Sequence, residues 1–231
     1  MGCDSYDLCR MVTNMEKHTR LLVSLTLILF FFAQDLVAQT DWKLRREEDG
    51  IIAYTRSREG IKFKEYKVEM IIDASHEQIL AVFKDYDKYP DIFPGTSDVK
   101  LLLDEETHYI TYVKFNIPFP VKDRDALFDN TMTYDADQDL LRIDIKCLTD
   151  EFDTNDKLVQ IKYCEGSWEF EELEDGRMRV MNQFIVDPGG FAPAFIVNSK
   201  TVDDPIKTCK SLREIVKEQK YSGHSFTLLE K

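Results

Sequence analysis

The residues of this chain that could bind a ligand or take part in chemistry are a few polar side chains among apolar ones. Arg124 and Asp125 follow a stiff apolar stretch, residues 116–121, that contains two prolines. Two interpretations of this charged pair stay open: an ion pair that closes a sheet, or a polar contact for the headgroup of a ligand. Asn182 lies on an otherwise apolar strand face. Because a buried amide must be hydrogen-bonded, it either pairs within the protein or meets a ligand or an internal water.

Sequence motifs for metal binding and for covalent catalysis are absent. The histidines are far apart, and no HxH, HExxH or Cys/His spacing occurs. There is no GxSxG nucleophile motif and no glycine-rich phosphate loop. We therefore expect no catalytic residue, no metal ligand and no cofactor.

Charge and composition restrict the partners. The 231 residues carry a formal net charge of −13, which argues against sequence-independent nucleic-acid binding. It also argues against simple electrostatic docking to anionic lipids. A hydrophobic content of 43% is typical of a globular chain of this length with one sizeable domain. We expect a monomer that binds no nucleic acid.

The first 38 residues have the pattern of a signal peptide. Lys17, His18 and Arg20 precede an apolar run over residues 21–33, and Ala38 is a suitable last residue before cleavage. The alternative is a retained membrane anchor, but the run is shorter than the ~20 residues that a span needs. We expect an exported protein, periplasmic or secreted.

Three cysteines follow this segment: Cys147, Cys164 and Cys209. The number is odd and no CxxC motif occurs, so we predict buried free thiols. A turn centred near Asp153 would put Cys147 opposite about Val159, so a bridge between Cys147 and Cys164 is not expected.

Hydrophobic periodicity predicts many strands and two helices. The predicted strands cover residues 42–46, 51–58, 62–72, 99–103, 109–115, 126–134, 140–148, 158–164, 166–172 and 177–186. A capping box at Ser75 and Gln78 begins the first helix, and Tyr89-Pro90 ends it. The second helix starts near Asp203. No βαβ alternation is present, so we predict an α+β fold with one long antiparallel sheet.

Three stretches carry a resemblance to a known family: residues 118–125, residues 166–168, and residues 187–193 running into Asn198. They resemble START domains, the steroidogenic-acute-regulatory-related lipid-transfer family of the helix-grip superfamily. The resemblance covers residues 42–221. Two departures are the missing N-terminal helix of eukaryotic members and Phe195 in a place that the family often gives to Trp.

The resemblance implies a helix-grip fold, a curved antiparallel sheet wrapped around a long C-terminal helix and an apolar cavity. It implies a ligand-binding domain over residues 39–221 with a tail over 222–231. The ligand would be a lipid or sterol-like molecule, carried between membranes through transient membrane contact. We assign the cavity to Arg124, Trp168, Met178, Val180, Asn182 and Phe184. We assign the gate to Ile117, Pro118, Phe119, Phe191, Pro193 and Phe195, and the lid helix to Ile206, Cys209, Leu212 and Val216. Pro193 and Pro205 suggest that this helix has two pieces.

Two alternatives remain. The first is an aromatase/cyclase-like enzyme of the same superfamily, in which Asp125 or Tyr134 would supply the general acid or base. The second is a domain whose apolar stripes fill the interior completely and that binds a protein partner through its acidic surface.

Overall fold

The computed structural model describes residues 42–149 and 157–230, so the predicted signal peptide lies outside the described residues. The strands are β1 (Lys43–Glu48), β2 (Ile51–Arg58), β3 (Ile61–Ile72), β4 (Thr96–Asp104), β5 (His108–Phe115), β6 (Arg124–Asp135), β7 (Leu140–Leu148), β8 (Val159–Gln160), β9 (Tyr163–Glu172) and β10 (Met178–Asp187). The α-helices are α2 (His76–Phe83), α3 (Tyr89–Ile92) and α4 (Ala194–Ile215), and short 3-10 turns cover η1 (Tyr86–Lys88), η2 (Gln219–Tyr221) and η3 (Thr227–Leu229).

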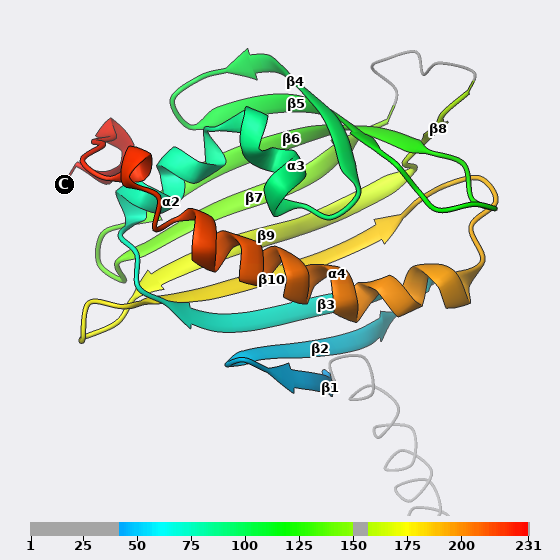
Figure 1. Ribbon diagram of the computed structural model, residues 1–231, viewed down its shortest axis with the longest axis horizontal. Helices are drawn as coiled ribbons and strands as arrows, with labels where there is room; N and C mark the ends of the chain where they lie inside the picture. Colours follow the sequence, from blue (N-terminus) through cyan, green and yellow to red (C-terminus); the bar gives the residue numbers. More distant parts are fainter. Residues whose placement is uncertain (1–41, 150–156, 231) are drawn as a thin grey trace, which may run out of the picture. The chain divides into compact units, whose positions relative to one another are not determined.

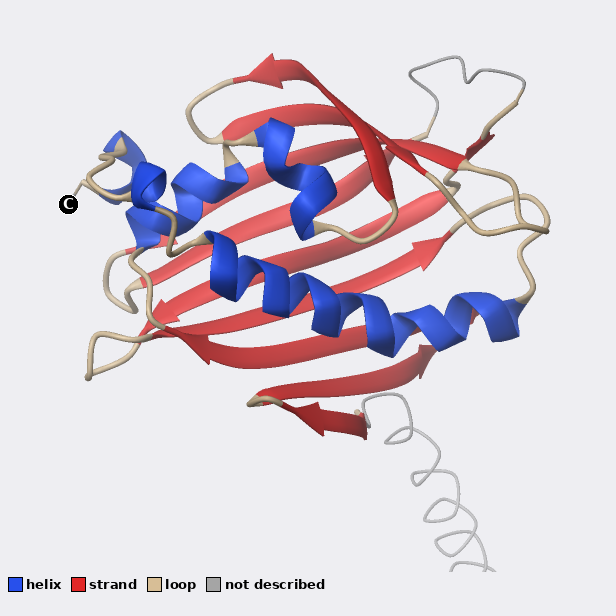
Figure 2. Ribbon diagram, in the orientation of Figure 1, coloured by secondary structure: helices blue, strands red, loops and turns tan. Residues whose placement is uncertain are grey.

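The described strands form one curved sheet in the order β1-β2-β3-β10-β9-β7-β6-β5-β4. All of these neighbours pair antiparallel; the short β8 pairs parallel to the start of β6. The helices lie on one face of the sheet, and α4 crosses it along β3 (Figures 1 and 2). The predicted α+β fold, a curved antiparallel sheet around a long C-terminal helix, is confirmed.

Helix α2 begins where the sequence predicts and ends earlier. The Ser75 hydroxyl accepts a hydrogen bond from the Gln78 backbone N–H (3.3 Å), and the Gln78 side chain accepts one from the Ser75 N–H (3.0 Å). The predicted end at Tyr89-Pro90 is wrong, because α2 stops at Phe83 and Pro90 lies in the first turn of α3. Proline fits there because the first turn of a helix needs no N–H donor.

Helix α4 is longer than predicted and is not divided. It runs without a break from Ala194 to Ile215 and contains Pro205. A proline inside a helix costs ~3 kcal/mol. Pro205 is buried, and the packing of the helix as a whole against β3 and β2 outweighs the local preference.

The prediction that Cys147 and Cys164 are free thiols is wrong, because the two form a disulfide with a Cα–Cα distance of 5.1 Å. The predicted strand 158–164 is in fact the short β8 followed by the start of β9. Strand β9 pairs with β7 in a register other than the predicted one, so that Lys146 faces Glu165. In this antiparallel register the next residue, Cys147, faces Cys164. Cys209 is a buried free thiol, as predicted, and burial raises its pKa to about 12.

The interior contains two apolar clusters. The main core joins the sheet to α2 and to the last part of α4, and it includes Trp168, Phe170 and Leu212. Phe226, Leu228 and Leu229 of the predicted tail also pack against it. A second, small cluster surrounds the disulfide and contains Ala126, Ile161, Cys164, Phe115, Phe128, Cys147, Phe184 and Val186. None of the helices in the described part of the chain combines the length and the apolar character that a membrane crossing requires.

Candidate ligand cavity

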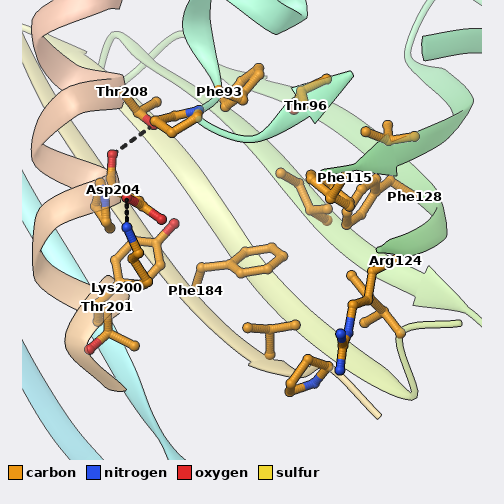
Figure 3. Close-up of a pocket in the computed structure, with 18 of the residues that line it drawn as sticks. Phe93, Thr96, Phe115, Arg124, Phe128, Phe184, Lys200, Thr201, Asp204 and Thr208 are labelled. Carbon is orange, nitrogen blue, oxygen red and sulfur yellow. Dashed lines mark hydrogen bonds and ion pairs between the residues drawn. The ribbon is translucent and has the colours of Figure 1, made fainter. Parts of the chain in front are cut away.

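A cavity of about 370 Å³ lies between the sheet and the first part of α4. This volume is at the lower end of the range for small-molecule pockets, about 300–1,000 Å³. Its wall is mainly apolar and aromatic (Figure 3). The apolar lining includes Phe83, Phe93, Val113, Phe115, Phe128, Ile145, Ile161, Trp168, Phe184, Val186, Ile196 and Val197.

The first part of α4 supplies one continuous wall of this cavity. Its lining residues follow two rows with a spacing of four, one of Val197, Thr201 and Pro205 and the other of Ile196, Lys200, Asp204 and Thr208. Side chains four residues apart lie on the same face of a helix. These rows therefore turn one face of the helix toward the cavity.

Asp204 is the acidic group of this wall. Burial raises the pKa of its carboxyl group, against the opposing effect of Lys200 and Lys207, whose ammonium groups lie 3.8 and 3.9 Å from it. The Thr208 hydroxyl donates to the Asp204 backbone carbonyl at 3.1 Å (Figure 3). Tyr66 also lines the cavity, and burial raises the pKa of its hydroxyl far above the usual range. The α4 side can thus offer a carboxylate, an ammonium group and a phenol to the polar part of a ligand.

Arg124 lies at the other end of the cavity wall and holds two loops together. Its buried guanidinium donates to the backbone carbonyls of Lys122, Gly189 (3.3 Å) and Phe191 (3.0 Å), and burial lowers its pKa. These hydrogen bonds tie the start of β6 to the loop between β10 and α4. Arg124 Nε is buried without a partner in the described part of the protein.

An ion pair between Arg124 and Asp125, one of the two interpretations that the sequence leaves open, is not formed. Consecutive residues of a strand point to opposite faces, so the two side chains diverge. Asp125 is fully buried and accepts a hydrogen bond from the Tyr112 hydroxyl at 2.9 Å. Neither Asp125 nor Tyr134, the two candidates for acid–base catalysis, lines the cavity.

The predicted gate residues fall into two groups. Ile117 and Pro193 line the cavity. Phe119, Phe191 and Phe195 are instead 96%, 73% and 77% exposed. Pro118 is also exposed. The two loops and the first turn of α4 therefore present three large aromatic side chains to the outside of the protein.

Glycines let one of these loops lie directly against β8. Gly189 and Gly190 both have positive φ angles. A Cβ atom on Gly189 would be 2.7 Å from the Gln160 carbonyl oxygen, and one on Gly190 would be 3.0 Å from a Val159 methyl group. Side chains at these positions would push the loop away from β8.

The structure brings together part of the predicted cavity. Arg124, Trp168, Asn182 and Phe184 line it. The Asn182 amide donates to the Ser167 carbonyl at 3.0 Å, so its N–H group is satisfied within the sheet. Met178 and Val180 are completely buried in the main core and do not line the cavity.

The predicted lid residues also lie elsewhere. Ile206, Cys209, Leu212 and Val216 are buried in the main core. The helix residues that do line the cavity include Ile196, Val197, Thr201 and Asp204, none of which was predicted from the sequence. Their spacing of four is visible in the sequence, but a helix that starts near Asp203 excludes all but one of them.

Comparisons with known proteins identify relatives. The sequence model of the family described as polyketide cyclase / dehydrase and lipid transport matches residues 72–199. An uncharacterised protein of Pseudomonas aeruginosa is 30% identical over 179 residues, 78% of this chain and 88% of that protein. The mouse phosphatidylcholine transfer protein is 24% identical over 187 residues, 74% of this chain and 85% of that protein. The STAR-related lipid transfer protein of Xanthomonas axonopodis superimposes with a TM-score of 0.71 at 24% identity, over 77% of this chain and 99% of that one.

Proposed function

The chain belongs to the polyketide cyclase/dehydrase and lipid transport family, and we propose that it binds a lipid or sterol-like molecule in the cavity under α4. The START-domain resemblance carried by residues 118–125 and 187–193 is thereby confirmed at the level of the family. One observation carries the proposal: a cavity of about 370 Å³ with a mainly apolar and aromatic lining lies under the first part of α4. Burial of an apolar ligand there contributes ~25 cal/mol per Å² of surface removed from water.

Transfer between membranes is the second part of the proposal. Phe119 and Phe191, in two loops, and Phe195, in the first turn of α4, are exposed close in sequence to Ile117 and Pro193, which line the cavity. Exposed aromatic side chains can enter the interface of a bilayer, where an apolar ligand would leave or enter the cavity without crossing water. The name of the mouse relative, a phosphatidylcholine transfer protein, supports this part of the proposal.

Export of the protein is the third part. The pattern of residues 17–38 predicts a cleaved signal peptide. The Cys147–Cys164 disulfide gives independent support, because disulfides persist mainly in oxidising compartments such as the periplasm and the extracellular space.

Native mass spectrometry of residues 39–231, purified from an exporting host, tests binding. We expect an added mass that solvent extraction releases as an apolar molecule, or saturable binding of a fluorescent lipid by the apo protein. Phe184→Asp, inside the cavity, should abolish binding, because it would bury a charge in an apolar site. Failure of the apo protein to bind any member of a panel of phospholipids, fatty acids and sterols would overturn the proposal.

The same preparation separates binding from transfer. Phe191→Asp combined with Phe195→Asp alters only exposed side chains, so binding in solution should be retained. We expect lipid exchange between two vesicle populations to slow at least tenfold. Unchanged exchange would refute the membrane contact and leave the ligand assignment intact.

A further inference from the structure

A group of titratable side chains outside the cavity lies at the end of the sheet away from β8 and from the loop between β10 and α4 (Figure 1). It consists of His76, the first residue of α2, Asp139, in the turn between β6 and β7, and Glu172, the last residue of β9. One potential ligand atom from each side chain lies within 4.8 Å of the other two. The Glu172 N–H also donates to the Asp139 carbonyl at 3.1 Å, which fixes the turn against the strand.

His76 has the arrangement of a metal-binding histidine. Its side chain is only 6% exposed, and Nε2 lies 3.0 Å from the Phe170 backbone carbonyl oxygen. A carbonyl can only accept, so Nε2 carries the hydrogen and Nδ1 of the neutral ring has a free lone pair. Nδ1 points toward Asp139, whose carboxylate oxygen is 4.0 Å away, beyond hydrogen-bond distance. Metal-binding histidines commonly donate their other ring N–H to a backbone carbonyl in this way.

The surroundings of this lone pair are negatively charged. The carboxylates of Asp139 and Glu172 lie beside it, and the Tyr134 hydroxyl donates a hydrogen bond to Asp139. Within the described ranges, no Lys or Arg forms an ion pair with either carboxylate. The positive end of the α2 dipole opposes a cation, but it amounts to only about half a unit charge. The net field favours a cation.

We propose that His76, Asp139 and Glu172 bind one divalent transition-metal ion of the zinc type. Zinc accepts one imidazole nitrogen and two carboxylate oxygens, and a water molecule would complete a tetrahedron. Ca²⁺ and Mg²⁺ prefer sites made only of oxygen, so the imidazole selects against them. No sequence motif predicts this site, because its ligands come from three elements that only the fold brings together.

The required rearrangement is small. Ligands about 2.1 Å from a tetrahedral ion are about 3.4 Å from one another, so distances of at most 4.8 Å must shorten by at most about 1.4 Å. The Asp139 side chain is 40% exposed and Glu172 is exposed, so both can move while His76 stays fixed. A bound ion would tie α2 to the β6–β7 turn and to the end of β9. None of the three residues lines the cavity, so the site is independent of the proposed ligand binding.

Titration of tag-free residues 39–231 with Zn²⁺ against a chromophoric chelator tests the proposal. We expect one saturable Zn²⁺ per chain. We also expect the unfolding midpoint to rise by about 5–10 °C when free Zn²⁺ exceeds the dissociation constant a hundredfold. Glu172→Gln and Asp139→Asn should each weaken binding at least about tenfold. Glu174→Gln, a matched change of an exposed carboxylate in the neighbouring turn, should leave it unchanged.

Direct observation of the histidine keeps the test decisive even if substitution of buried His76 impairs folding. In the wild-type protein, Zn²⁺ should shift the ¹⁵N resonance of His76 Nδ1 and leave the Nε2 proton in place. No saturable binding, equal binding by the Glu172→Gln and Asp139→Asn variants, an unshifted Nδ1 resonance, or equally strong binding of Mg²⁺ would each overturn the proposal.

Discussion

The two ends of helix α4 face different interiors. From Ile206 onward the helix packs into the main core, where Cys209 and Leu212 are almost completely buried. One face of its first part, from Ile196 to Thr208, lines the cavity instead. One helix on one sheet therefore makes a closed core at one end and a hollow at the other.

The hollow end is held together by other means. An unfilled cavity gives up apolar burial and packing contacts, which lowers stability. At this end the Cys147–Cys164 disulfide joins β7 to β9, and Arg124 hydrogen-bonds two loops. A covalent link and hydrogen bonds from the Arg124 side chain to backbone carbonyls thus replace part of the burial that the closed end has. This division lets the protein keep the cavity without losing its fold.

Truncation of one side chain at each end of α4 gives the largest expected contrast. Leu212→Ala should lower the free energy of unfolding by about 2–5 kcal/mol, because Leu212 is fully enclosed. Ile196→Ala, the matched change on the cavity side, should cost less than about 1 kcal/mol, because Ile196 is only half-buried. Urea unfolding of the apo proteins measures both. Equal losses would mean that the cavity end is packed as tightly as the core.

Removal of the disulfide should give the next largest effect. Cys147→Ser combined with Cys164→Ser opens a link across 17 residues and should cost about 3 kcal/mol. Hydrogen exchange should speed up in β8 and in residues 187–193, and less in α2. The control is a thiol titration of unfolded, unreduced wild-type protein, residues 39–231. One free thiol is expected if the disulfide is present, and three if it is not.

The sequence predicted local secondary structure better than the pairing and packing of segments that are distant in sequence. Alternation located the strands, and the Ser75–Gln78 capping box located the start of α2, because these signals act between near neighbours. The Cys147–Cys164 pairing depends on a register across a long connection, and an error of a few residues there changed the partner. The continuity of α4 through Pro205 depends on packing against a sheet distant in sequence.

The cavity was the hardest feature to predict. Met178, Val180, Trp168 and Phe184 alternate in the same way along the sheet, yet only the last two line the space. An inward-facing apolar residue looks the same in the sequence whether another side chain or a ligand will cover it. That outcome depends on where α4 crosses the sheet, which no local pattern specifies.

Asp204 should give the smallest effect, and its sign tests whether the cavity wall desolvates it. The folded-state pKa of this carboxyl is raised, mainly by burial, so the folded protein holds the proton more tightly than the unfolded chain does. Below pH 3.8, the ordinary pKa of an aspartate side chain, Asp204 is protonated in both states and the protein keeps its full stability. As the pH rises through the higher folded-state pKa, ionisation of Asp204 lowers the free energy of unfolding.

Asp204→Asn should accordingly be more stable than wild type at pH 7 and lose that advantage near pH 3. The gain should stay below ~1 kcal/mol, because the side chain is 34% exposed and solvent screens it. Urea unfolding of both proteins across this range measures the difference. A variant that is less stable at pH 7 would show that the ion pairs with Lys200 and Lys207 stabilise the charged Asp204 by more than burial destabilises it. Solvent would then reach the carboxylate beside α4.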